Sequence, residues 1–371
     1  MPEGKSHKAS PAAAPLSGGD RSGALPDEIL HRVLSFLPAQ QAVRTCVLAR
    51  HWLHLWKHAT GLRVVGADGK EPALFEEIRE FVDSLIILRG SSPIERFEVK
   101  VAGAAIDVRN LRLWVRHGMM CNVQVLRLKV HGGYASQMLP FKNPSLASSH
   151  LTKLELRGLV FNNDFLDFSR CPAIQHLILK DCSFRNAERI SSQSLKHLTI
   201  KRSEFNLSSR IPIHAPNLAS LELQVEGGRT PMLERMPLLV SADVLISGSC
   251  DYCLRSDNGD CGDESCKGCI PNDTLSVLLH GISEAETLSL GSGTITGFKV
   301  NVKMSGRFNP KKLPSTMPPH LKIVQVRCGK VDKRVLEVLE YLSKFNISMV
   351  SLGNTLTLSI FLSSGLRCCG N

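Results

Sequence analysis

Two pairs of cysteines in the second half of the chain have a spacing that could bind a metal ion. Cys250 and Cys253 form one C-x-x-C pair, Cys266 and Cys269 form the other, and twelve residues separate the pairs. Two such pairs can supply the four thiolate ligands of a tetrahedral Zn²⁺ ion. The spacing makes structural zinc one hypothesis for this segment.

The charges around these cysteines favour a different interpretation. Residues 250–269 contain five carboxylates and only two cations. Four thiolates on one Zn²⁺ already leave a net negative charge, and crowded carboxylates raise thiol pKa values and disfavour such an anionic cluster. The alternative is therefore a thiol-rich acidic loop that holds no metal. Metal analysis of the purified protein would separate the two hypotheses.

The other reactive residues do not form a catalytic pattern. The sequence has no phosphate-binding loop of the G-x-x-x-x-G-K-[ST] type, no G-x-S-x-G nucleophile turn and no H-E-x-x-H motif. Its 13 histidines are scattered along the chain, so a catalytic triad could be assigned only by assuming proximity. We therefore predict that the protein is not an enzyme.

A recurring apolar pattern predicts a series of repeated units in the middle of the chain. The pattern is apolar, two residues, apolar, one residue, apolar, as in Leu151, Leu154 and Leu156. Its first four intervals are 28, 23, 21 and 23 residues, which lie in the range of leucine-rich repeats. A phenylalanine stands five positions after the last apolar residue in three successive units, which predicts a stacked column inside the repeats. These residues are Phe161, Phe184 and Phe205.

The residue after the last apolar position is basic in four of the units. Side chains alternate between the faces of a strand, so these residues should point away from the core. Strands lie about 4.8 Å apart, so the charges would form one column on the open face of the sheet. Either these side chains extend into solvent beside Glu155 and Glu222, or they form a docking face for an acidic protein substrate. The four residues are Lys129, Arg157, Lys180 and Lys201.

A dense apolar segment near the N-terminus predicts a unit of three short helices. Pro26 suits the first position of a helix, apolar residues then recur at helical spacing, and Pro38 ends that helix. Trp52 and Trp56 lie four residues apart and would share one helical face. Units below about 40 residues rarely fold alone, so a partner or the rest of the chain must cover this apolar surface.

The order of residues in this segment resembles the F-box of plant F-box/leucine-rich-repeat proteins. The resemblance rests on LPDEIL from Leu25, SFLP from Ser35, VRTCVLAR from Val43 and the two tryptophans. It implies binding to a Skp-type adaptor and, through it, to a cullin complex. It also implies that the apolar residues of the motif contact the adaptor or hold the helices together. These residues are Leu25, Pro26, Ile29, Leu30, Val33, Leu34, Leu37, Val47, Trp52, Leu55 and Trp56.

The predicted fold class is α+β or α/β, with a three-helix F-box followed by an irregular leucine-rich-repeat solenoid. Residues 317–347 resemble the FBD segment of the same plant proteins, which implies a strand and a helix that cap the solenoid. The predicted regions are a disordered lead-in at 1–22, the F-box at 23–60, a helical and strand connector at 61–120, the repeats at 121–300 with the cysteine-rich acidic insert at 250–270, the FBD-like cap at 301–347 and an atypical tail at 348–371.

Charge and composition narrow the class of partner. The net charge is +11, but residues 301–371 carry +8 and residues 250–300 carry −5, so the excess is not one basic patch. Aromatic residues, which stack on bases, make up 5% of the chain, which argues against nucleic acid. The Ser and Thr content of the tail argues against a membrane span. Dispersed cysteines and the lack of a signal-peptide pattern predict the cytoplasm and/or the nucleus.

Together with the repeats, the resemblance implies the substrate-recognition subunit of a Skp-cullin-F-box (SCF) ubiquitin ligase. The F-box would bind the adaptor, the repeats would bind an unknown protein substrate, and other subunits would transfer ubiquitin. No cofactor is predicted unless the insert binds zinc. The alternative is a non-catalytic scaffold of leucine-rich repeats with no role in ubiquitination. A zinc-stabilised nucleic-acid binder is a third hypothesis, favoured only by the net charge and the cysteine pairs.

Overall fold

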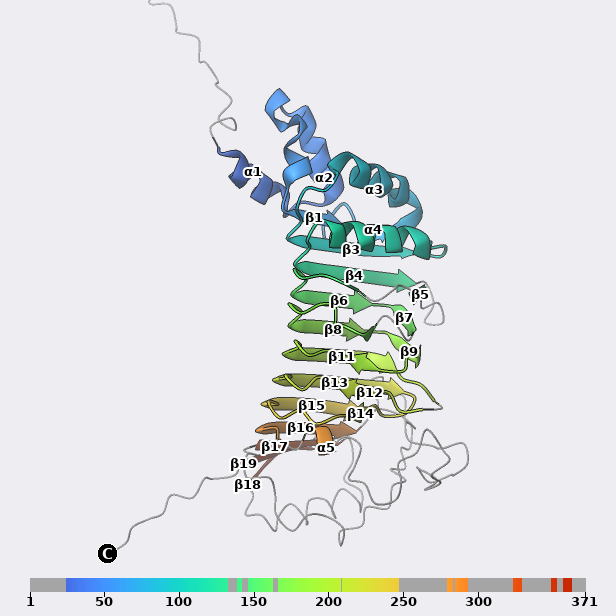
Figure 1. Cartoon of the computed structure of the whole chain (residues 1–371), viewed down its shortest axis with the longest axis vertical. Coiled ribbons are helices and arrows are strands. Elements are labelled where there is room, and N and C mark those ends of the chain that lie inside the picture. The colour runs from blue at the N-terminus through green and yellow to red at the C-terminus, as the bar shows by residue number, and fades with distance from the viewer. Residues whose placement is uncertain are drawn as a thin grey trace, which may run out of the picture.

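A group of short helices precedes a long stack of β-strands in the computed structural model of the chain (Figure 1). The predicted lead-in at 1–22, the insert at 250–270 and the helix expected near 335–342 lie outside the residues that the structure describes, so they stay predictions. The structure describes residues 25–132, 139–141, 146–162, 166–207, 209–246, 279–282, 284–292, 323–328, 348–351 and 356–361.

The helical unit begins with two short α-helices and continues in 3₁₀ turns. α1 (Asp27–Leu34) follows Pro26 and α2 (Ala39–Arg44) follows Pro38, as the fixed φ of proline at a helix start predicts. The second and third helices are shorter than predicted. The Thr45 hydroxyl donates to a carbonyl one turn earlier at 2.7 Å, a local bond that competes with continued α-helix. The 3₁₀ segments are η2 (Thr45–Val47), η3 (Arg50–Leu53) and η4 (Leu55–His58).

Two longer helices and three strands connect the helical unit to the rest of the sheet. α3 (Phe75–Arg89) and α4 (Val108–Met120) lie within the predicted connector at 61–120. The indole nitrogen of Trp114 donates to the Asp83 carboxylate at 2.7 Å, which joins α4 to α3. The strands of this region are β1 (Gly61–Val64), β2 (Ala73–Leu74) and β3 (Arg96–Gly103).

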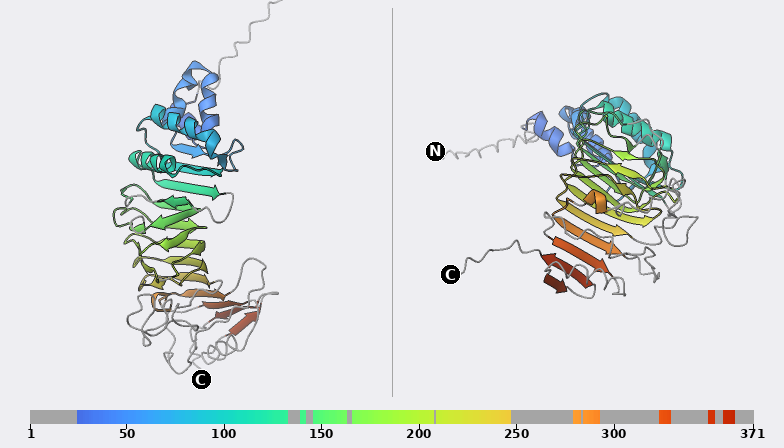
Figure 2. Two further views of the ribbon diagram at one scale, coloured as in Figure 1. Left: turned by 90° about the vertical axis from the view of Figure 1, so that its right-hand side faces the viewer. Right: turned by 60° about the horizontal axis from the view of Figure 1, so that its bottom comes forward.

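A parallel β-sheet forms the body of the molecule (Figure 2). Its path runs from β1 through β3, β4, β6, β8, β11, β13, β15 and β16 to β17, and each pair of neighbours on this path is parallel. β19 and β18 then add antiparallel strands. The main strands are β4 (Val125–Gly132), β6 (Lys153–Arg157), β8 (His176–Lys180), β11 (His197–Glu204), β13 (Ser220–Gly227), β15 (Ser241–Ile246), β16 (Thr287–Ser292), β17 (Ile323–Cys328), β18 (Ser348–Ser351) and β19 (Leu356–Phe361).

Shorter elements lie in the connections between the main strands. β10, β12 and β14 pair with one another in a second, three-stranded parallel sheet, whereas β5, β7 and β9 pair side by side and join the main sheet through β11. The chain therefore consists of an N-terminal helical unit followed by mixed α/β structure on a parallel sheet. The shorter elements are β5 (Leu139–Phe141), β7 (Leu159–Asn162), β9 (Ser183–Asn186), β10 (Ile190–Ser191), β12 (Pro212–His214), β14 (Met232–Leu233) and α5 (Leu279–Ile282).

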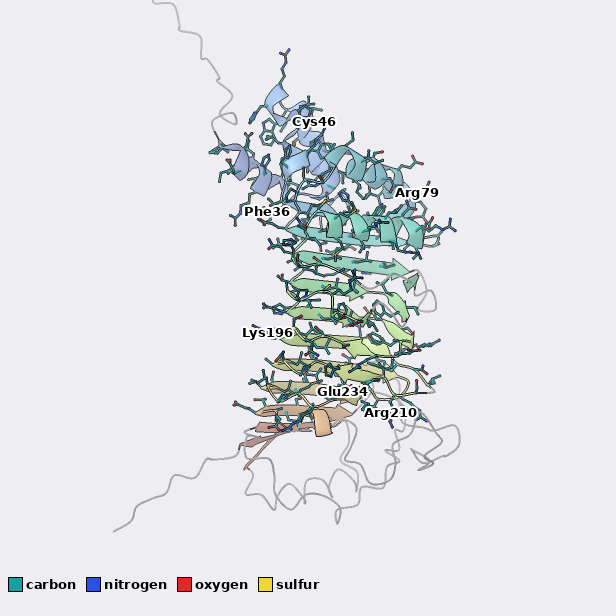
Figure 3. The ribbon with its side chains drawn as sticks, in the orientation of Figure 1. Phe36, Cys46, Arg79, Lys196, Arg210 and Glu234 are labelled. Carbon is teal, nitrogen blue, oxygen red and sulfur yellow. The ribbon has the colours of Figure 1, made fainter. Side chains whose placement is uncertain are left out.

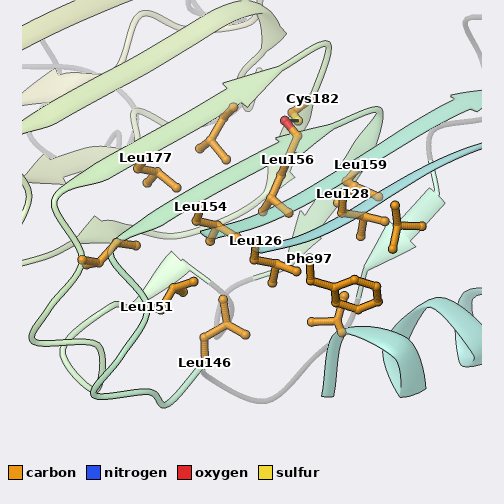
Figure 4. Packing of buried hydrophobic residues seen from close by; sticks show 14 of the residues in the cluster. Phe97, Leu126, Leu128, Leu146, Leu151, Leu154, Leu156, Leu159, Leu177 and Cys182 are labelled. Carbon is orange, nitrogen blue, oxygen red and sulfur yellow. Dashed lines mark hydrogen bonds between the residues drawn. The ribbon is translucent and has the colours of Figure 1, made fainter. Parts of the chain in front are cut away.

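Leucines at the predicted repeat positions fill the inner face of the main sheet. Leu154, Leu177 and Leu198 are register partners on β6, β8 and β11, and all three are buried. Figure 4 shows the first two packed among neighbouring leucines. Because the same position is apolar in each unit, one strand packs on the next without a change of register.

The predicted phenylalanine column is confirmed. Phe161, Phe184 and Phe205 are buried, and consecutive rings stack with centroid separations of 5.5 Å and 4.9 Å. Stacked rings add to the hydrophobic stabilisation from their burial. The column runs along the inside of the connections and joins three consecutive units.

Candidate protein-interaction surfaces

An apolar row lies exposed on the first helix. Leu25, just before α1, and Ile29 and Val33 of α1 are each about half exposed, at 48%, 48% and 49%. Their spacing of four residues places them on one face of the helix. Val47, at 82%, and Leu48 add further exposed apolar side chains in the 3₁₀ turns. Leu25, Ile29 and Val33 together form the apolar row.

Other apolar residues of the same segment form its core. Leu30 and Leu34 face inward from α1, and Leu37 is partly buried. Trp52 and Trp56 do not share one helical face, because they lie in separate 3₁₀ turns, but both are buried with Leu55. Of the residues predicted to contact an adaptor, the structure leaves Leu25, Pro26, Ile29, Val33 and Val47 exposed.

Three exposed apolar residues were absent from the sequence-based prediction. Phe36 is exposed after α1, on the helical end of the molecule (Figure 3), and Leu48 and Leu53 are exposed in the 3₁₀ region. Apolar residue type alone does not distinguish an exposed position from a buried one. The four-residue spacing of the apolar row could have separated it from Leu30 and Leu34.

A buried arginine joins the helical unit to the sheet. Arg89, at the end of α3, is 4% exposed and donates to the carbonyls of Trp56 at 3.2 Å, Ala59 at 2.5 Å and Pro93 at 3.2 Å. Burial lowers the pKa of its guanidinium to about 10, which still leaves it charged at neutral pH. These bonds tie the end of the helical unit to α3 and to the segment before β3.

A second arginine makes a similar connection from β1. Arg63 donates to the Phe36 carbonyl at 2.5 Å and to the Gly69 carbonyl at 2.9 Å, and its Nε bonds the Glu98 carboxylate at 3.0 Å. At Gly61, a Cβ atom would lie 2.6 Å from a backbone oxygen of the α1 end, so only glycine fits there. The helical unit is therefore packed directly on the first strand.

The predicted basic column is present in the sheet register. Lys129 pairs with Arg157, Arg157 with Lys180, and Lys180 with Lys201, each on the next strand. Lys100 of β3 extends the column by one strand, because it pairs with Lys129. The alternation of side chains thus places five cations in one row on the open face.

Carboxylates neutralise most of this column. Lys129 lies 2.8 Å from Glu155, and Lys201 lies 2.5 Å from Glu222. These contacts fit the interpretation in which the two glutamates accompany the basic side chains. Among the described residues, Lys180 has no ion-pair partner.

Asp181, which follows β8, pairs with two arginines. It accepts hydrogen bonds from Arg157 at 2.5 Å and from Arg202 at 2.6 Å. Burial raises the pKa of the Asp181 carboxyl, but Arg202 and Arg157 outweigh that effect and hold the pKa below its ordinary value. Asp181 has a positive φ of 50°, a conformation that Asp and Asn tolerate better than most residues.

A shallow hollow of about 440 Å³ opens on the same face beside this column. His176 and His197 form part of its lining, and their rings stack at 4.5 Å with an interplanar angle of 3°. Strands β13 and β15 contribute hydroxyl and carboxylate groups to the rest of the lining. Sequence spacing did not single out this hollow, because its lining residues come from separate units.

Two further predictions from the sequence concern zinc binding by the cysteine pairs and the lack of a membrane span. Cys250, Cys253, Cys266 and Cys269 lie outside the described residues, so structural zinc stays a prediction. In the described ranges, no cluster of three or more His, Cys, Asp or Glu side chains could hold a metal ion. No helix within those same ranges is long and apolar enough to cross a membrane.

Comparison with known proteins supports the class indicated by the helical unit. Residues 24–60 match the F-box domain family, and this range contains the apolar row, the 3₁₀ turns and the buried tryptophans. The chain therefore carries an F-box domain at the N-terminal end of its parallel sheet. No solved structure matches the chain.

The chain is also similar to plant proteins whose names include the F-box. It is 30% identical over 245 residues to an F-box/LRR-repeat protein of Arabidopsis thaliana, a match that covers 54% of this chain and 40% of the relative. It is 25% identical over 255 residues to an FBD-associated F-box protein of that plant, covering 61% of each. Another F-box/LRR-repeat protein is 25% identical over 317 residues, covering 76% of this chain and 64% of the relative.

These relatives confirm the resemblance to plant F-box/leucine-rich-repeat and FBD-associated F-box proteins. The first matches cover between 40% and 61% of the relatives' own lengths. The chain thus spans only part of the length of these curated relatives.

Proposed function

We propose that this protein is the substrate-recognition subunit of an SCF ubiquitin ligase. The F-box binds a Skp-type adaptor, and the parallel sheet is a leucine-rich-repeat solenoid whose open face binds a target protein. Ubiquitin is transferred by other subunits of the cullin complex, in the cytoplasm and/or the nucleus. The observation that carries the proposal is that the F-box match coincides with apolar side chains that the fold leaves exposed.

Packing on the sheet covers only part of the F-box. Trp56 and Leu55 are buried, and Arg89 bonds the carbonyl of Trp56, so the inner side of the unit is already satisfied within the chain. The apolar row and Val47 remain exposed after that packing. Exposed apolar residues clustered on one small unit are typical of a protein-interaction surface. We assign this surface to the adaptor.

Tethering explains how a protein with no catalytic motif acts in ubiquitin transfer. The adaptor contact would hold one end of the chain in the complex, and the open face would hold the target. Holding two reactants on one body raises their effective concentration. Short flexible linkers already give effective concentrations in the millimolar range. Arg63 and Arg89 support such a body, because Arg63 bonds the F-box to the first strands of the sheet and Arg89 bonds it to α3 and the segment before β3.

Co-purification with a Skp-type adaptor tests the first half of the proposal. Replacing both Val47 and Leu48 by Asp should weaken adaptor binding at least tenfold, about 1.4 kcal/mol or more, because charges then enter an apolar interface. The matched control is Ile87→Asp, since Ile87 is equally apolar and exposed on α3. Thermal unfolding of both variants should resemble that of the parent protein. Unchanged adaptor binding in the double variant would contradict the assignment.

Target stabilisation tests the second half. A protein captured by the open face should accumulate when this chain is depleted, and it should be ubiquitinated in a reconstituted complex. Adaptor binding without either effect would favour the scaffold alternative, in which the repeats bind partners that are not degraded. Binding to the adaptor and binding to the target are separate measurements, so each half can fail alone.

A further inference from the structure

The hollow on the open face joins two halves of opposite charge. Outward positions of the strands from β3 to β11 include the basic column, whereas the outward positions of β13 and β15 include Glu222 and Asp243. The hollow spans strands β8 to β16, where these halves meet. Its lining includes His176, His197, Ser220, Glu222, Ser241 and Asp243.

Two stacked histidine rings form one side of the hollow's lining. The rings of His176 and His197 are almost parallel at 4.5 Å. Burial lowers the pKa of His176, and the nearby His197, Lys153 and Lys196 lower it further. The lowered pKa favours the uncharged form of His176 at neutral pH, and an outer face of the stacked pair can take another planar group.

Hydrogen-bond acceptors lie beside this aromatic surface. Glu222 and Asp243 are register partners on β13 and β15, so their carboxylates project side by side from adjacent strands. Directly opposed like charges are unfavourable unless a cation lies near them. Lys201 pairs with Glu222 at 2.5 Å. The Ser241 hydroxyl donates to Ser220 at 3.1 Å and keeps lone pairs available as acceptors.

We propose that the hollow binds an arginine side chain of the target, and that acidic residues of the same extended segment lie over Lys180. This inference rests on the proposed function, in which the open face binds the target. A planar guanidinium stacks on aromatic rings and bonds carboxylates in a bidentate manner, whereas a lysine ammonium does neither. Arginine therefore fits this combination of stacked rings, hydroxyls and paired carboxylates.

The strand spacing sets the separation of the two kinds of charge. Asp243 on β15 and Lys180 on β8 are three strand intervals apart, about 14 Å at about 4.8 Å per strand, and two register positions apart along the strands, about 7 Å, so they are separated by about 16 Å. An extended chain covers about 3.3 Å per residue, so the arginine and the acidic residues are about four or five residues apart. The occupant is thus an acidic segment with one arginine at that distance.

Synthetic peptides test this assignment with the full-length protein. Fluorescein-labelled decapeptides would carry three consecutive acidic residues and, four positions away, arginine, lysine or citrulline, the neutral isostere of arginine. Fluorescence anisotropy at low salt should show the arginine peptide binding about tenfold more tightly than the citrulline peptide, as expected for a charge-assisted bidentate contact. The lysine peptide should fall between them. Equal affinities for the arginine and citrulline peptides would overturn the proposal, and equal affinities for arginine and lysine would contradict the stacking argument.

Three variants assign the effect to the hollow. Asp243→Asn should reduce the preference for arginine over citrulline to about twofold, because it removes one carboxylate with little change in shape. Lys180→Glu should weaken all three peptides by a similar factor. Arg79→Glu is the matched control for that reversal, since Arg79 lies exposed on α3, away from the hollow (Figure 3), and should change nothing. A preference for arginine that survives Asp243→Asn would place its binding elsewhere.

Adaptor binding is measured on the same preparations to separate this proposal from the proposed function. If the adaptor binds and none of the peptides does, the arginine assignment fails, but the proposal that the F-box binds the adaptor is retained. If the peptides bind as predicted but the adaptor does not, the hollow is retained and the ligase role fails. Thermal unfolding confirms that each variant is folded before its affinity is interpreted.

Discussion

The F-box and the open face of the sheet present surfaces of different character. The F-box exposes Ile29, Val33 and Val47, whereas the open face exposes paired cations and carboxylates around Lys180 and Glu222. Apolar surface contributes free energy in proportion to the area removed from water, and salt affects it little. Exposed charges contribute less free energy but impose charge complementarity. Under the proposed function, the F-box provides affinity for one constant partner while the sheet provides selectivity.

The same residue type also has different roles in the two regions. Phe184 is buried in the stacked column of the sheet, whereas Phe36 is exposed beside the F-box helices. Packing the phenylalanine column joins successive units, so its members support the whole sheet. An exposed phenylalanine next to the apolar row contributes nothing comparable to the fold of the isolated chain. One substitution made at both positions separates stability from binding.

Phe184→Ala should have the largest effect on stability. Removing a buried phenylalanine costs about 3 to 5 kcal/mol, through lost burial and the cavity that remains. Phe36→Ala, the matched control, should change the free energy of unfolding by less than about 0.5 kcal/mol, as is usual at the surface. Urea unfolding measures both, and adaptor binding should weaken only for Phe36→Ala. Similar destabilisation at the two sites would contradict a structural role for Phe184 and a binding role for Phe36.

The contact that Arg89 makes between the F-box and α3 should contribute nearly as much to stability as Phe184 does. Arg89→Met removes the donors for the Trp56 and Ala59 carbonyls at the end of the F-box and for the Pro93 carbonyl before β3. Leaving buried carbonyls unpaired costs about 1 to 3 kcal/mol each where water cannot replace the donor, and we expect a total loss of about 3 kcal/mol. Arg79→Met on the same helix should be nearly neutral, since Arg79 is exposed. A destabilised chain in which only the F-box signals broaden by NMR would show that Arg89 holds the two regions together.

The repeats were more predictable from the sequence than the surfaces were. Leu154, Leu177 and the phenylalanine column follow a fixed spacing, because each unit must place the same side chain on the same inner face. Exposure within the F-box was less evident, since Val47 and Leu30 are both apolar and only the tertiary packing separates them. The partner of Arg157 was also missed, because Asp181 acts from a turn outside the strand pattern.

Salt provides a milder test of the comparison between the surfaces. Raising the salt from about 0.05 M to about 0.5 M should weaken binding of the arginine peptide by about tenfold, because exposed charges are then screened over a few ångströms. Adaptor binding through the apolar row should change by less than about twofold over the same range, since apolar burial does not depend on screening. Titrations of both ligands against one preparation measure this. Parallel salt dependence would indicate that charges dominate both interfaces.

Lowering the pH should have the smallest effect on stability, through the ion pairs of Asp181 next to the basic column. The pKa of Asp181 is lowered in the folded protein because Arg202 and Arg157 outweigh the effect of burial. A lowered carboxyl pKa stabilises the fold above the unfolded-state value of about 4, and this contribution is lost as the pH falls through the folded-state pKa. Asp181→Asn keeps a residue that tolerates the positive φ and removes only the charge. We expect it to cost about 1 kcal/mol or less at pH 7, because the pair is partly exposed. The difference from the parent protein should shrink below about pH 4, whereas a constant difference across that range would assign the role of Asp181 to its shape.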